Sequence, residues 1–292
     1  MVKPEAILYQ EEIEMVYRGF IVWGAGIVVV LGVFLIFVAA GWPGDVNSCV
    51  HDTPNSCYCE AFNLHDAIAG TSGVRQPVNT WFNLYSILTS GIVALFVYCD
   101  RKAGGSRNPI RSNSLIPDLF IFAVLFLGLG SMWFHASIKA WGGVTDQLSM
   151  FVYAVFLIFY SIRRLWNNEV FFWICYPITV FLFTVIAAFW TWEFASLILI
   201  LILVAIYLVF EFIIFGRTGK WWQGKPLTIV LWWAAVVAIG MATLFWALSR
   251  TPLSKLCDPH SAFQPHGLLW HPLAGVMAVL LYFYWREDTD FA

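Results

Sequence analysis

Long stretches almost free of charged residues dominate this 292-residue chain and determine its expected fold. An α-helix of about 20 apolar residues spans the hydrocarbon core of a bilayer. Because one stretch is short and only Thr191-Trp192-Glu193 separate two others, a count of seven helices stays open beside a count of eight. The pattern predicts an all-α, polytopic membrane helix bundle, with eight transmembrane helices in total. The expected helices are Phe20–Ala40, Val78–Tyr98, Leu119–Ile138, Gln147–Ile162, Val170–Trp190, Phe194–Phe215, Pro226–Leu248 and Gly267–Trp285.

Composition agrees with a membrane protein. Hydrophobic residues make up 60% of the chain and charged residues 12%, which fits no class of soluble protein. The first stretch begins late and lacks a small-residue cleavage site, so we interpret it as a membrane anchor and not as a signal peptide. The preceding segment, Pro4–Tyr17, holds several glutamates and predicts a short helix lying at the inner membrane surface.

Lysine and arginine residues orient the predicted bundle, because positive charges are retained on the cytoplasmic side. With the N-terminus inside, twelve of them fall in inner segments and four in outer segments. This asymmetry supports an even number of helices and predicts that both termini are cytoplasmic. The net charge of −2 and the absence of a long basic stretch give no indication of a nucleic-acid partner. Nothing indicates an obligatory protein partner, and the identity of the host membrane stays open.

Four of the six cysteines, Cys49, Cys57, Cys59 and Cys257, fall in outer segments, on a side that is normally oxidising. One or two disulfides are therefore expected, with Cys59 to Cys257 as the preferred pair, although other connectivities stay open. The remaining two, Cys99 and Cys175, are interpreted as packing residues.

Side chains able to bind a metal gather at the outer ends of the predicted helices. All six histidines lie on that side of the chain: His51, His65, His135, His260, His266 and His271. Ser131 and His135 are four residues apart and so share one face of a helix. Asp146 follows His135 by eleven residues, and a turn over Lys139–Thr145 with two glycines is expected to place it at the opening of the next helix.

The final helix adds His266 and His271 at its outer end. Three histidines from two helices form a sufficient ligand set for a catalytic zinc ion, which keeps one position open for water. Zinc on His135, His266 and His271 would activate that water, and Asp146 would move its proton to the leaving group. Ser131 would donate a hydrogen bond to the developing oxyanion. A site at the membrane boundary predicts a lipid substrate.

These motifs resemble the alkaline ceramidase family, part of a superfamily of seven-helix membrane hydrolases with the progestin and adipoQ receptors and the GPI-lipid remodelling proteins. The likeness extends over about Cys57–Trp285, where Tyr58-Cys59-Glu60 is similar to the family's Trp-Cys-Glu and Gln76–Asn83 to its Glu-x-x-Asn-Thr-x-Ser-Asn. The resemblance implies hydrolysis of the ceramide amide to a sphingoid base and a fatty acid. It also implies a seven-helix core at 78–286, preceded by a cytoplasmic segment (1–18), an extra transmembrane helix (19–41) and an outer loop (42–77), and followed by a cytoplasmic tail (287–292).

The chain departs from the family pattern in three places. The family's closing motif is His-x-x-x-His, whereas His266 and His271 are five residues apart and would diverge on a regular α-helix. A π-bulge or an unwound first turn around Gly267, next to Pro272, would bring them together. Phe82 replaces the family's serine, and we have no physical account of that change.

The third departure concerns a second metal. The resemblance implies a calcium site before the core, but Cys57, Phe62 and Gln76 stand where the family has Asp, Asn and Glu, and Glu60 alone matches clearly. Calcium takes several oxygen ligands, so this site is either lost or rebuilt with Asn63, Asp66 and Asn79.

Three functions are compared on this basis. The leading one is a ceramidase-like amide hydrolase, and the alternatives are an acyl or ester hydrolase on another lipid and a receptor or scaffold with a structural metal site. A transporter is disfavoured because the inner halves of the helices offer little polar chemistry except Glu211, which is expected at the inner interface.

Overall fold

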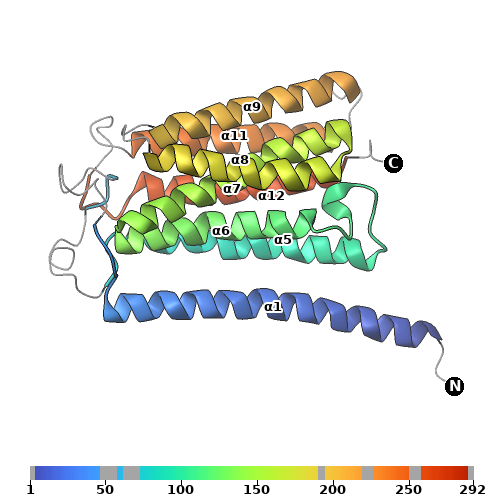
Figure 1. Ribbon diagram of the computed structural model, residues 1–292, viewed down its shortest axis with the longest axis horizontal. Coiled ribbons are helices and arrows are strands. Elements are labelled where there is room, and N and C mark those ends of the chain that lie inside the picture. Colours follow the sequence, from blue (N-terminus) through green and yellow to red (C-terminus); the bar gives the residue numbers. More distant parts are fainter. Residues whose placement is uncertain are drawn as a thin grey trace.

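The computed structural model describes residues 4–46, 58–61, 73–189, 195–218, 226–249 and 258–288. Within these ranges all regular elements are helical, and the single extended feature is an isolated bridge between Val46 and Lys139. Figure 1 shows the long helices lying side by side along one direction. The elements are α1 (Pro4–Ala40), α4 (Pro77–Trp81), η1 (Phe82–Leu84), α5 (Tyr85–Lys102), η2 (Pro109–Arg111), α6 (Ile116–Ser137), α7 (Ala140–Trp166), α8 (Glu169–Phe189), α9 (Ala195–Thr218), α11 (Pro226–Leu248), η3 (His266–Trp270) and α12 (His271–Arg286).

The described part of the chain holds eight helices long and apolar enough to cross a membrane, which confirms the predicted polytopic bundle. Two of these spans are composite: α4, η1 and α5 form one, and η3 continues into α12 to form another. Figure 1 shows that α1 begins and α12 ends at the same end of the bundle. We call the end where α6 finishes and η3 begins the His end, because His135 and His266 lie there, and the other the opposite end.

Helix α7 forms the centre of the bundle. It packs against α6, α8 and α9, and every residue from Ser149 to Ser161 is buried. A second extensive contact joins α11 and α12, and large aromatic side chains such as Trp232, Trp246 and Trp285 are almost fully buried in the common core. Lipid takes the place of water around such a bundle, so exposed apolar side chains on the outer faces carry no penalty.

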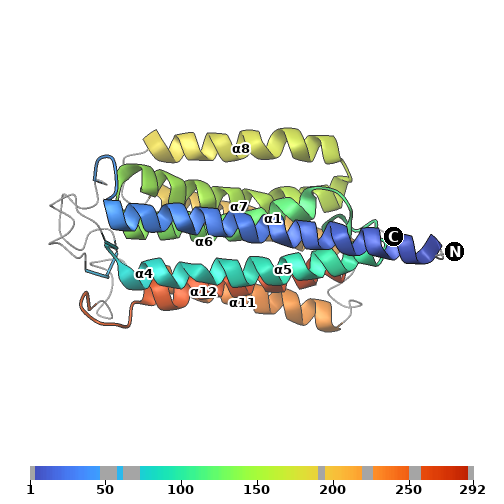
Figure 2. The same cartoon turned by 90° about the horizontal axis from the view of Figure 1, so that it is seen from below.

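Helix α1 stands apart from the other helices along most of its length (Figure 1). Seen from below, it runs across α6 and α7 (Figure 2). Its closest packing is at the His end, where Phe34 and Phe37 contact the rings of Trp42 and Trp133. We predicted a separate surface helix at Pro4–Tyr17, and this is wrong in one respect, because these residues continue α1 without a break. Between Glu5 and Tyr17 there is no glycine or proline to end the helix.

The connection between α6 and α7 corrects a second prediction. We expected a turn over Lys139–Thr145, but the chain reverses at Ile138, whose φ of 48° is left-handed, and α7 already begins at Ala140. Gly142 lies inside the helix, where a Cβ atom would stand 2.8 Å from Ser137 Oγ and 3.1 Å from Phe134 Cα. This glycine therefore permits close packing of the two helices and forms no turn, and Asp146 lies well inside α7 and not at its start.

Glu211, which was expected at the inner interface, is fully buried at the opposite end of the bundle, where it pairs with Arg164. Its position relative to the membrane surface stays a prediction. Arg164 Nη1 donates to Glu211 Oε1 at 2.7 Å, and Arg164 Nη2 donates to Asp288 Oδ2 at 2.6 Å. The hydroxyls of Ser161 and Tyr284 donate to Glu211 at 2.7 Å each. This network joins α7, α9 and the residues after α12.

We expect Glu211→Leu to destabilise the protein by about 3–5 kcal/mol, because it leaves the buried Arg164 guanidinium with incomplete charge compensation. The matched control is Asp118→Asn, which breaks the half-exposed pair of Arg101 and Asp118. That change should cost only about 0–1 kcal/mol. Reversible unfolding in detergent micelles measures both. Equal stability of the two variants would show that the buried network contributes nothing beyond a surface pair.

Candidate metal centre

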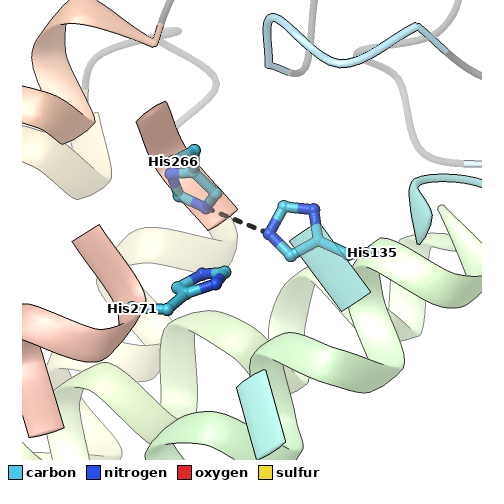
Figure 3. A group of neighbouring side chains, drawn as sticks. All are labelled: His135, His266 and His271. Atoms are coloured by element: carbon cyan, nitrogen blue, oxygen red, sulfur yellow. Dashed lines mark hydrogen bonds between the residues drawn. The ribbon is translucent and has the colours of Figure 1, made fainter. Parts of the chain in front are cut away.

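Three histidines converge at the His end, as predicted. His135 lies in the last turn of α6, His266 is the first residue of η3 and His271 the first of α12. All three are buried, and one nitrogen atom from each ring lies within 4.8 Å of the others. His135 Nε2 and His266 Nε2 are 3.1 Å apart. Figure 3 shows the three rings facing one another from two sides of the bundle.

A π-helical turn brings His266 and His271 to the same side of the final helix. The backbone N–H of His271 donates to the carbonyl of His266, five residues earlier, in place of the α-helical bond to the fourth. Pro272 follows and has no N–H to donate, which favours a departure from regular helical bonding at this point. Of the two rearrangements that we considered for this sequence, the structure therefore contains the π-bulge.

Gly267 lets this turn press against α4. A Cβ atom at Gly267 would stand 3.0 Å from Asn79 Oδ1 and 3.0 Å from the carbonyl carbon and oxygen of Val78. The position of His266 therefore depends on a contact with a helix almost 190 residues earlier in the chain.

Ser131 and Asp146 line the same small cavity as His266 and His271. Ser131 lies one helical turn before His135 on α6. Its Oγ is 3.4 Å from His271 Nε2. Asp146 is buried and reaches the cavity from α7. Apolar side chains, among them Leu127, Met150, Trp246, Trp270 and Ala274, form the rest of the lining. The structure thus brings the five predicted site residues together: Ser131, Asp146, His266 and His271 line the cavity, and His135 joins them through the histidine cluster.

Two tyrosines near the histidines were not identified as site residues from the sequence. The ring of Tyr58 stacks on His266 with centroids 4.0 Å apart and lies 4.9 Å from the ring of His135. Tyr85, at the start of α5, stacks on His271 at 6.3 Å. The sequence singled out Tyr58 only as part of the Tyr58-Cys59-Glu60 motif. That motif does not indicate which histidine ring Tyr58 contacts.

The segment before α4 runs along the end of α6 and was also missed as part of the site. Arg75 N–H donates to the carbonyl of Ala136 at 3.0 Å, and Gln76 N–H donates to that of His135 at 3.1 Å. The side chain of Gln76 returns to the same histidine, with Oε1 2.6 Å from His135 Nδ1. The sequence had marked Gln76 only as a departure from a family glutamate.

Glu60 caps the first helix of the site. Its two carboxylate oxygens accept hydrogen bonds from the backbone N–H groups of Val78 and Asn79, at 2.8 Å each. Burial raises the pKa of Glu60 above its ordinary value, and these two hydrogen bonds oppose part of that rise. Glu60 and Asn79 thus lie together, while Asn63 and Asp66 are outside the described residues, so the calcium site stays a prediction.

Cys59 is disulfide-bonded. Cys99 and Cys175, the other cysteines among the described residues, are free, so the partner lies outside the described residues. We predicted both as packing residues, and this is wrong for Cys99, whose side chain is exposed, whereas Cys175 is partly buried. The backbone N–H of Cys59 donates to the carbonyl of Ser249, the residue after α11, at 2.9 Å. The pairing of Cys59 with Cys257 stays a prediction.

Comparison with known proteins adds no identification. No protein-family model matches the chain, and no curated protein sequence matches it. The chemistry of the site is therefore argued from its own geometry.

The donor set can hold a metal ion of the zinc type. Two nitrogens bound to one tetrahedral zinc at about 2.0–2.1 Å lie roughly 3.3–3.4 Å apart. His135 Nε2 and His266 Nε2 are separated by 3.1 Å, close to that value. The buried imidazoles suit a borderline-soft divalent ion, and the cavity with Ser131 and Asp146 offers room beside it for a further ligand.

We expect Gly267→Ala to lower metal affinity by roughly tenfold or more, because the added methyl group displaces the π-turn that carries His266. Gly240→Ala is the matched control, since no atom stands within 4 Å of a Cβ at that helical position. Metal content after dialysis against graded chelator concentrations measures the effect. Identical retention by the two variants would argue against any dependence of the site on the contact between η3 and α4.

Proposed function

We propose that this protein is a zinc-dependent membrane hydrolase that cleaves the amide bond of ceramide-like lipids to a sphingoid base and a fatty acid. The observation that carries the proposal is a cluster of three buried histidines inside a transmembrane bundle, two of which line one cavity together with Ser131 and Asp146. A polar set of this kind is costly within a membrane, and such groups are commonly functional.

Each residue then has a role in hydrolysis. A zinc ion on the three histidines supplies Lewis acidity toward the substrate carbonyl and toward water. Asp146 accepts the proton of the attacking water and passes it to the leaving nitrogen. Ser131 donates its hydroxyl hydrogen to the carbonyl oxygen as negative charge develops there. The apolar lining excludes bulk water, which strengthens these electrostatic contacts.

The site's position supports a lipid substrate. The three histidines and Asp146 all belong to helices long and apolar enough to span the membrane. The choice of an amide over an ester rests on the motif resemblance.

The proposal includes an orientation. The bias of lysine and arginine favours cytoplasmic termini, and α1 begins and α12 ends at the end opposite the histidines (Figure 1). Hydrolysis would then take place near the outer or lumenal face of the host membrane.

The test measures zinc and hydrolysis on the same purified protein. Wild type should bind about one zinc per chain, and His135→Ala should lose it together with activity. Asp146→Asn should keep the metal but hydrolyse a ceramide roughly 10²- to 10⁴-fold more slowly, because it lacks the proton acceptor. Asp118→Asn, which changes a half-exposed carboxylate far from the histidines, serves as the matched control and should behave as wild type.

A second substrate separates the competing functions. An ester with the same two chains replaces the ceramide in a parallel assay. Preference for the ester would redirect the proposal to an acyl or ester hydrolase. Retained zinc without turnover of either lipid, in wild type, would indicate a structural metal site and contradict the enzymatic role.

A further inference from the structure

Gln76 is held by hydrogen bonds of both its backbone and its side chain. Its backbone N–H donates to the carbonyl of His135, and its side-chain Nε2 donates to the carbonyl of Glu60 at 2.8 Å. Its Oε1 accepts from Asn79 Nδ2 at 3.4 Å and lies 2.6 Å from His135 Nδ1. The residue is fully buried, so protein groups and not solvent satisfy its side chain.

These partners fix which way the amide points. A backbone carbonyl only accepts hydrogen bonds, so the group facing Glu60 has to be the NH₂ of the amide. The oxygen of Gln76 then faces His135. Because an amide oxygen only accepts, His135 Nδ1 has to be the donor of the 2.6 Å hydrogen bond.

The protonation of one ring nitrogen determines the other. A neutral imidazole carries a single N–H, so with the proton on Nδ1 the lone pair of His135 is on Nε2. That nitrogen faces His266 Nε2 at 3.1 Å, at the centre of the histidine cluster. Gln76 therefore selects the tautomer in which His135 is ready to bind a metal ion.

Gln76 also restrains the position of the ring. It holds His135 at two points, the main-chain carbonyl and Nδ1, and its own carbonyl accepts the first helical hydrogen bond of α4 from Thr80. Glu60 anchors the next two residues, Val78 and Asn79, through their N–H groups. The ring of His135 is thus fixed between the rigid ends of α6 and α4.

We infer that Gln76 is a positioning residue that holds His135 as its Nδ1–H tautomer and directs Nε2 to the metal ion. The inference rests on the metal centre of the proposed function but not on the identity of the substrate. Groups that orient a metal-binding histidine in this way typically contribute 10- to 100-fold to metal affinity.

The first experiment compares zinc affinities by chelator competition on the full-length protein in detergent. Gln76→Leu removes the acceptor and should weaken zinc binding about 10- to 100-fold. Gln76→Glu keeps an oxygen toward His135 and should regain most of that loss. Thr80→Val, a buried neighbour whose side chain has no hydrogen-bond partner among the described residues, should bind as wild type. Wild-type affinity in Gln76→Leu would overturn the inference.

The second experiment measures the tautomer of His135 directly in wild type, so its result does not depend on whether a Gln76 variant folds. Nitrogen NMR of ¹⁵N-histidine-labelled, metal-free wild type should show His135 with its proton on Nδ1, the signal being assigned by its loss in His135→Ala. A proton on Nε2 would overturn the inference even if zinc binds. Failure of wild type to bind zinc would instead refute the proposed function, while the tautomer would still decide the role assigned to Gln76.

Discussion

Inside a membrane-spanning bundle a buried polar group has to find its partner within the protein, because no water is available to it. Two clusters follow from this constraint. At the His end, the imidazoles of His135, His266 and His271 face one another. The side-chain amide of Gln76 contacts His135, and the carboxylate of Glu60 caps α4. At the opposite end, Arg164 is enclosed by Glu211 and Asp288. The buried middle of α7, from Ser149 to Ser161, lies between the two clusters.

The bundle itself could be predicted because its signal is local. A run of apolar residues marks a spanning helix regardless of what it packs against, and all eight were found in this way. The errors arose where a residue has two local interpretations. Gly142 suggests a turn, yet its missing side chain serves the contact with Phe134 and Ser137 on the neighbouring helix. Arg164 carries no sign of its partner in the sequence, and only the fold brings it to Glu211.

The residue types of the candidate site could be predicted from the sequence, but the contacts that hold these residues in place could not. Spacing placed Ser131 and His135 on one face, and chemistry singled out His266 and His271. The π-turn that makes the last two converge depends on the fit of Gly267 against α4, which spacing cannot encode. Gln76 and Tyr58 carry no metal-binding signature, and their contacts with histidines 59 and 208 positions away exist only in the folded chain. Trp133 shows the same point, since it lies in the Ser131–His135 turn but faces the rings of α1.

The order of these groups along the chain has a consequence for biosynthesis. Helices enter the membrane as the polypeptide is made, from the N-terminus onward. His135 is in place once α6 has been inserted, whereas His266 and His271 belong to the last helix. The histidine cluster therefore cannot form until the chain has been extended by more than 130 residues beyond His135. A chain that stops before His266 has one of the three histidines and so lacks the ligand set that could hold a metal ion.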